Sequence, residues 1–111
     1  MKRILIIEDN EQRIKQFKSN FKGAELTIVK TVDSAIKTIK KEKVFSYMFF
    51  DHDLGNGGDS IDIINWLLNH KSKIAKNIYV HSANPVGAQN IVNRIPHARK
   101  AAMIWKKEIK F

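Results

Sequence analysis

The chain has 111 residues, the size of one domain over residues 1–111, and no cysteine for a disulfide or a thiolate metal site. Its 20 Lys and Arg outnumber its 11 Asp and Glu, and the charge of +9 favours an anionic phosphate-ester partner; without a basic block, nucleic acid is not expected. No apolar run is long enough for a signal peptide or for the ~20 residues of a membrane span, so we expect a cytoplasmic protein without membrane contact.

Five short apolar segments alternate along the chain with four helical patterns. Strands are predicted at residues 4–7, 26–30, 45–50, 78–82 and 101–105. Helices are predicted in "EQRIKQFKSNF" with Asn10 as cap, in "SAIKTIKKEK" with Thr31 or Asp33 as cap, in "SIDIINWLLNH", and from Asn84 and Pro85 onwards. This alternation predicts an α/β fold with a doubly wound, five-stranded parallel sheet.

Polar side chains end or follow four of the five predicted strands at their carboxyl ends, which meet at one edge of such a sheet. They are Glu8 and Asp9, then Asp51, His52 and Asp53, then His81, Ser82 and Asn84, and finally Lys106. Clustered carboxylates repel one another unless a cation neutralises them, and oxygen ligands suit Mg²⁺ or Mn²⁺. We therefore expect a divalent metal at this edge, with basic surroundings that attract an anionic substrate.

In order and spacing, these residues resemble a receiver domain, the phosphoacceptor module of response regulators. "ILIIEDN" is similar to the opening strand of that family, which places Glu8 and Asp9 at metal-binding positions, and Asp51 falls on the phosphoacceptor aspartate. Ser82 falls on the hydroxyl residue after the fourth strand, and Lys106 falls near the lysine after the fifth. The resemblance implies a flavodoxin-like receiver fold, whose last helix is missing or short because six residues follow the fifth predicted strand.

Two further motifs, "DHDLG" at 51–55 and "HSANP" at 81–85, together resemble the cyclic-phosphate-processing receiver domain. That resemblance implies binding or hydrolysis of a cyclic phosphate ester or cyclic nucleotide. Asp51, with Glu8 and Asp9, is then a metal ligand, or Asp51 attacks phosphorus. His52, Asp53 or His81 handles protons. The phosphate-binding residues are Ser82, the helix start at Asn84, and Lys106.

Other interpretations fit parts of the sequence. One is a stand-alone receiver that is phosphorylated on Asp51 by a histidine kinase and signals through a protein partner. Another is a module that binds a cyclic nucleotide without cleaving it. Successive residues of a strand alternate between faces, so the sequence leaves open whether His52 and His81 line the cleft.

Overall fold

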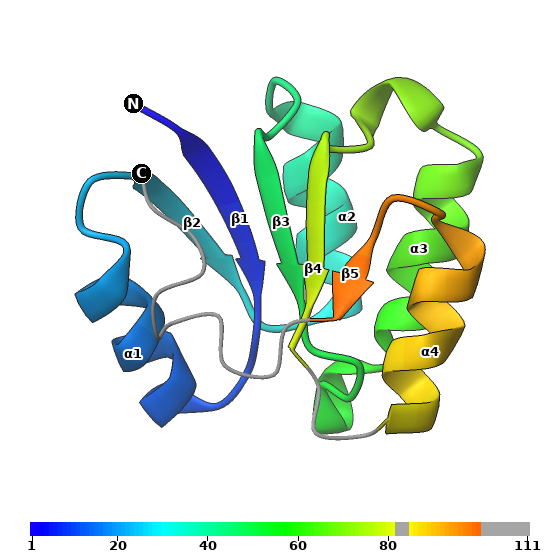
Figure 1. Cartoon of the computed structure of the whole chain (residues 1–111), viewed down its shortest axis with the longest axis horizontal. Coiled ribbons are helices and arrows are strands. Elements are labelled where there is room, and N and C mark those ends of the chain that lie inside the picture. The colour runs from blue at the N-terminus through cyan, green and yellow to red at the C-terminus, as the bar shows by residue number, and fades with distance from the viewer. Residues whose placement is uncertain (82–84, 101–111) are drawn as a thin grey trace.

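The computed structural model describes residues 1–81 and 85–100 (Figure 1). Five parallel strands form one sheet in the order β2-β1-β3-β4-β5. The strands are β1 (Arg3–Ile7), β2 (Glu25–Val29), β3 (Tyr47–Phe50), β4 (Asn77–Val80) and β5 (Arg99–Lys100). The helices are α1 (Glu11–Asn20), α2 (Val32–Lys41), α3 (Ser60–Leu68) and α4 (Pro85–Arg94), with short 3₁₀ turns η1 (Gly55–Gly57) and η2 (Lys71–Lys73).

The predicted α/β fold with a doubly wound, five-stranded parallel sheet is confirmed, and its strand order is that of the flavodoxin-like receiver fold. The first four strands begin and end within two residues of their predicted positions. The described part of the fifth strand is Arg99–Lys100, just before the predicted segment 101–105. That segment, the expected short or missing last helix, and Ser82, Asn84 and Lys106 all lie outside the described residues.

Alternation along the strands divides the core between two faces of the sheet. One face packs against α2, α3 and α4 through the buried strand residues Leu5, Ile7, Met48, Phe50, Ile78 and Val80. The other face packs against α1, where Phe17 and Phe21 contact Ile4, Ile6 and Phe49. Figure 1 shows this arrangement, with α1 on one face and the other three helices on the opposite face.

Side-chain caps start α1, α2 and α3. The Asn10 side chain accepts a hydrogen bond from the Arg13 amide, 3.0 Å, and starts α1. Thr31, one of the two predicted caps, forms a capping box with Ser34 at the start of α2. Asp59 caps α3 by accepting from the Ile61 amide at 2.9 Å.

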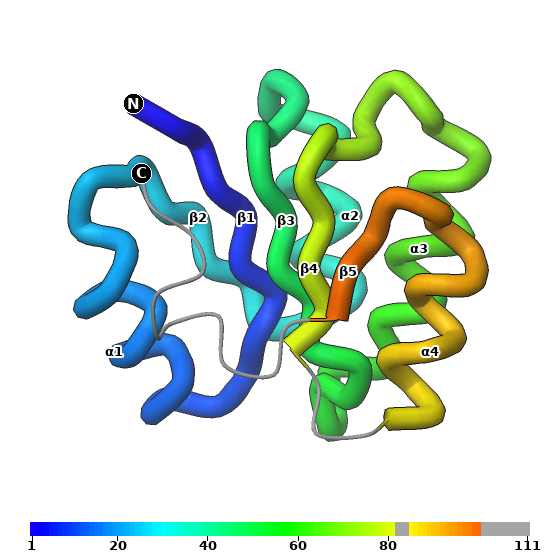
Figure 2. Tube along the Cα trace, in the orientation of Figure 1, coloured from blue at the N-terminus to red at the C-terminus, as the bar shows by residue number. Residues whose placement is uncertain are grey.

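The chain leaves β1 and β3 in opposite directions, which creates the switch point of the sheet. After β1 it turns to α1 on one face, and after β3 it turns through η1 to α3 on the other face (Figure 2). Ligands of doubly wound sheets bind at the carboxyl ends of strands beside such a point. Among the described helices, none has the length and apolar character that a membrane span needs.

Candidate metal and phosphate site

Three carboxylates gather at the switch point between β1 and β3. Glu8 and Asp9 follow β1, Asp51 follows β3, and their oxygen atoms lie within 4.8 Å of one another. Successive strand residues point to opposite faces of the sheet, so Glu8 lies on the face of Ile4 and Ile6, and Asp51 lies on the face of Phe49. These apolar residues belong to one core cluster, so Glu8 and Asp51 lie on the same face. Glu8 and Asp51 are buried and Asp9 is exposed, so the cluster has one side open to solvent.

Glu8 is held by hydrogen bonds on both of its oxygen atoms. Oε2 accepts from the backbone amides of the next two residues, at 3.0 and 3.1 Å. Oε1 lies 3.0 Å from Nε2 of His81, whose side chain is fully buried and packs edge-on against Phe17. Burial by itself raises the pKa of Glu8, but the hydrogen bonds with His81 and Asp51 outweigh it and lower the pKa to about 2.

Burial lowers the pKa of His81 and keeps its ring neutral, although Glu8 acts in the opposite direction. A neutral ring beside a carboxylate donates through Nε2–H, which leaves Nδ1 as the acceptor nitrogen. Nδ1 is buried and has no hydrogen-bond partner among the described residues. His81 therefore lies on the same face as Glu8 and fixes its orientation.

Asp51 is the carboxyl group that keeps a proton. Burial raises its pKa to about 7, with the neighbouring Glu8 carboxylate adding to the rise and Arg13 opposing it. Its backbone is fixed on both sides, because its amide donates to Ile7 at 3.0 Å and its carbonyl accepts from the Ser60 hydroxyl. Two adjacent carboxylates cannot both ionise at low cost without a cation.

A cation that sequence reasoning missed already reaches this cluster. Arg13, in the first turn of α1, places Nη1 3.3 Å from Oε1 of Glu8 and 3.4 Å from Oδ2 of Asp51. From the sequence, Arg13 was one of several basic residues on a helix face. The available signal was its place in the first turn after the acidic strand end, four residues beyond Asp9.

His52 lies on the opposite face from His81. Its Nε2 is 3.4 Å from Oδ1 of Asp59, and its ring lies so close to Gly87 of α4 that a Cβ there would be 2.3 Å from it. Its Nδ1 is buried and has no hydrogen-bond partner among the described residues. The two histidines are therefore not brought together: His81 contacts Glu8, whereas His52 packs against α4.

Asp53 and the glycine loop form a compact turn beside the acids. Asp53 is exposed, accepts a hydrogen bond from the Gly55 amide at 2.8 Å, and pairs with Asp59 in an isolated bridge. Gly55 has φ +58°, which glycine adopts without strain, and a Cβ there would lie 3.4 Å from Oδ2 of Asp9. Buried Leu54 anchors the loop, so Asp53 sits at the rim and outside the carboxylate cluster.

The donor set of this cluster fits a hard divalent cation. It offers carboxylate oxygens that follow two adjacent strands, and its exposed side leaves room for water. Mg²⁺ is usually bound by a few carboxylates and keeps several of its waters. The Glu8 carboxylate adds to the burial that raises the pKa of Asp51, whereas the nearby Arg13 guanidinium lowers it, so positive charge stabilises the ionised cluster. Glu8, Asp9 and Asp51 are the residues that could hold the metal.

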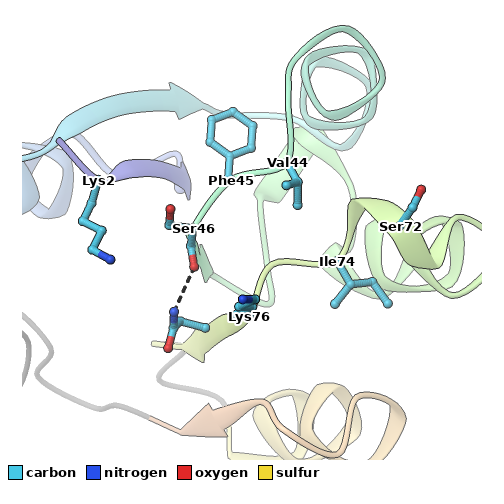
Figure 3. Close-up of a pocket in the computed structure, with 8 residues that line it drawn as sticks. Lys2, Val44, Phe45, Ser46, Ser72, Ile74 and Lys76 are labelled. Carbon is cyan, nitrogen blue, oxygen red and sulfur yellow. Dashed lines mark hydrogen bonds between the residues drawn. The ribbon is translucent and has the colours of Figure 1, made fainter.

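A hollow of about 420 Å³ lies at the other end of the sheet from the acidic cluster. Figure 3 shows it at the amino ends of the strands, where Lys2 and Ser46 line it. The Ser46 carbonyl accepts a hydrogen bond from the Asn77 side chain at 3.0 Å. Lys76 and Phe45 also line it. Its lining contains none of the predicted site residues, so we do not assign the functional site to this hollow.

Solved structures that share this fold include response regulators. The response regulator TrrA from Thermotoga maritima in complex with Mg(2+)-BeF has a TM-score of 0.75 at 17% identity, over 96% of this chain and 92% of that chain. A response regulator receiver domain protein from Methanospirillum hungatei has 0.70 at 20%, over 99% and 84%. A response regulator from Burkholderia pseudomallei, with a phosphorylated aspartic acid, calcium ion and citrate, has 0.72 at 21%, over 99% and 62%.

No curated protein matches the sequence. A family model does: the Cyclic-phosphate processing Receiver domain matches residues 3–97, which include both acidic strand ends and the glycine loop. The chain therefore belongs to the family of cyclic-phosphate processing receiver domains.

Proposed function

We propose that this receiver-type domain hydrolyses a cyclic phosphate ester, for example a cyclic nucleotide, with a divalent cation held by Glu8, Asp9 and Asp51. The observation that carries the proposal is the cluster of three carboxylates within 4.8 Å at the switch point of the sheet. The family's own description and the positive charge of the chain support an anionic, cyclic substrate. Mg²⁺ and Mn²⁺ are the cations that this oxygen donor set suits best.

Hydrolysis adds a water oxygen to phosphorus and breaks one of the two ester P–O bonds, and the leaving alkoxide takes up a proton. A bound divalent cation supplies charge stabilisation for the phosphoryl oxygens. Asp51 is its ligand or the nucleophile, and Glu8 is fixed for ligation by His81 and two backbone amides. Asp53, exposed at the rim, is our first choice for the group that takes a proton from the attacking water and passes it to the leaving alkoxide.

The remaining predicted residues have supporting roles in this proposal. His52 lies beside Asp51 in sequence but packs against α4, so we assign it to positioning the Asp51 segment against that helix. His81 is buried beneath Glu8 and acts as a positioning residue, without touching substrate. Ser82, Asn84 and Lys106 are proposed to bind phosphoryl oxygens, as the resemblance implies.

The test is ³¹P NMR of the protein with Mg²⁺ or Mn²⁺ and a panel of 3′,5′-cyclic nucleotides, 2′,3′-cyclic phosphates and acetyl phosphate. We expect a cyclic-phosphate signal to convert to a monoester signal, and Asp51→Ala to abolish the conversion. Asp33→Ala is the matched control, because Asp33 is an exposed carboxylate on α2 that pairs with Lys37. Saturable binding of a cyclic phosphate without conversion would replace hydrolysis with sequestration.

A second function fits one specific observation, the position of Asp51 at the carboxyl end of β3 in a receiver fold. There the chain would act as a signalling receiver that is phosphorylated on Asp51 by a histidine kinase and read by a protein partner. In the same NMR experiment, this function predicts consumption of acetyl phosphate and a new acyl-phosphate signal on the protein. Cyclic phosphates would remain intact, which would refute the first proposal.

A further inference from the structure

Arg13 is the residue whose placement the proposed chemistry does not yet use. Its backbone is fixed in the first turn of α1, because its amide donates to the Asn10 side chain at 3.0 Å. From there the guanidinium reaches Glu8 at 3.3 Å and Asp51 at 3.4 Å. The Arg13 side chain is 34% exposed, whereas those of Glu8 and Asp51 are 0% and 7% exposed. Arg13 thus contacts two buried acids although about a third of its own side chain is exposed.

The partners of Glu8 differ in how easily they can leave. Two are backbone amides and one is the buried ring of His81, so these three hydrogen bonds are fixed by the fold. Buried Asp51 also hydrogen-bonds to Glu8, and the remaining partner among the described residues is Arg13, on a flexible and partly exposed side chain. A divalent cation that binds Oε1 of Glu8 and Oδ2 of Asp51 needs the oxygen atoms that Arg13 contacts. Asp9, exposed and next in sequence to Glu8, gives the cation a first point of attachment.

We propose that Arg13 is the resident counter-ion of the acidic cluster and that a divalent metal must displace it. Arg13 therefore weakens metal binding. Once displaced, its guanidinium is free at the open side of the cluster, where its planar donors suit the oxygen atoms of a phosphoryl group. Metal and phosphate then strengthen each other's binding, and linkage makes this effect reciprocal. The inference rests on the proposed metal site and adds how that site is regulated.

The experiment measures Mg²⁺ affinity by isothermal titration at pH 8, without any substrate, for the wild type and Arg13→Gln. We expect Arg13→Gln to bind Mg²⁺ about tenfold more tightly, since the metal no longer has to break two partly exposed ion pairs. Arg13→Lys keeps a cation and should stay near the wild type. Lys18→Gln is the matched control: it removes the same charge from α1, and Lys18, a described residue, forms no ion pair with Glu8 or Asp51.

A second titration repeats the measurement with inorganic phosphate as the probe. Phosphate should tighten Mg²⁺ binding to the wild type severalfold and change the affinity of Arg13→Gln much less. The ¹H–¹⁵N signal of the Arg13 Nε–H group should shift when Mg²⁺ is added to the wild type, because the guanidinium leaves the carboxylates. Thermal unfolding of each metal-free variant establishes that it is folded.

The results separate this inference from the proposed function. If Arg13→Gln binds Mg²⁺ no more tightly than Lys18→Gln does, the inference is wrong, while hydrolysis in the NMR experiment can still uphold the function. Tighter binding by Arg13→Gln without any hydrolysis upholds the counter-ion role and refutes the esterase. If neither the wild type nor Arg13→Gln binds Mg²⁺ or, in a repeat of the titration, Mn²⁺, both proposals are wrong.

Discussion

Replacing Asp51 by asparagine is expected to stabilise the metal-free protein above neutral pH. Burial, with Glu8 adding to the effect, raises the pKa of Asp51 from 3.8 to about 7. An asparagine side chain has nearly the same shape and can still donate a hydrogen bond to Glu8, as protonated Asp51 does. The substitution therefore removes the negative charge of Asp51, which burial and Glu8 disfavour in the folded protein, and keeps the hydrogen bond to Glu8.

The sign of the effect follows from the two pKa values. Asp51 loses its proton near pH 3.8 when the chain is unfolded and near pH 7 when it is folded. Between these values the folded protein binds more protons, so the free energy of unfolding of the wild type falls as the pH rises through this window. About 1.36 kcal/mol per pH unit gives an upper value of about 4 kcal/mol. Because Glu8 and Arg13 share the interaction, we expect Asp51→Asn to gain about 2–4 kcal/mol at pH 8.

Urea unfolding followed by circular dichroism, at pH 4 and pH 8 with a chelator present, measures this gain. Asp51→Asn should exceed the wild type clearly at pH 8 and only slightly at pH 4, where Asp51 is protonated in the folded wild type. The control Asp33→Asn alters an exposed carboxylate and should change stability by less than about 0.5 kcal/mol at both pH values. Equal or lower stability of Asp51→Asn at pH 8 would refute the argument that a buried like-charge pair strains this site.

Three other substitutions test the surroundings of the cluster. Gly87→Ala should lower the free energy of unfolding by about 1–3 kcal/mol, because its Cβ would overlap the His52 ring. In a His52→Ala background the same substitution should be neutral or stabilise the protein by up to about 1 kcal/mol. An equal cost in both backgrounds would contradict the contact. His81→Phe should cost about 1–3 kcal/mol in urea unfolding at pH 7, because Glu8 loses a buried donor, and His81→Gln should cost less. Gly57→Ala should lower the melting temperature by several degrees, because its Cβ would lie 2.7 Å from the carbonyl oxygen of Lys30, just after β2. An unchanged melting temperature would mean that the loop can move to avoid this contact.

The sequence by itself determined the sheet and the acidic end of it. Alternating apolar and helical segments were enough to predict a doubly wound parallel sheet, because strand and helix periodicities are local properties of the chain. The same parity places Glu8 and Asp51 on one face at the ends of adjacent strands, which is why the carboxylate cluster could be expected. The predicted strand 45–50 begins two residues too early. Phe45 is buried like a strand residue, but the first residue of β3 that pairs with β1 is Tyr47.

Only the tertiary structure decided which charged side chains reach the cluster. Arg13 and Asp51 are 38 residues apart in the chain, and His81 and Glu8 are 73 apart. Their contacts depend on how α1 is laid across the sheet and on which face each strand end presents. Basic residues on a helix look alike in sequence, since each is a cation at helical spacing. Arg13 becomes a counter-ion because the fold places the first turn of α1 beside two buried carboxylates. His52 lies on the opposite face of the sheet, where it packs against Gly87 of α4.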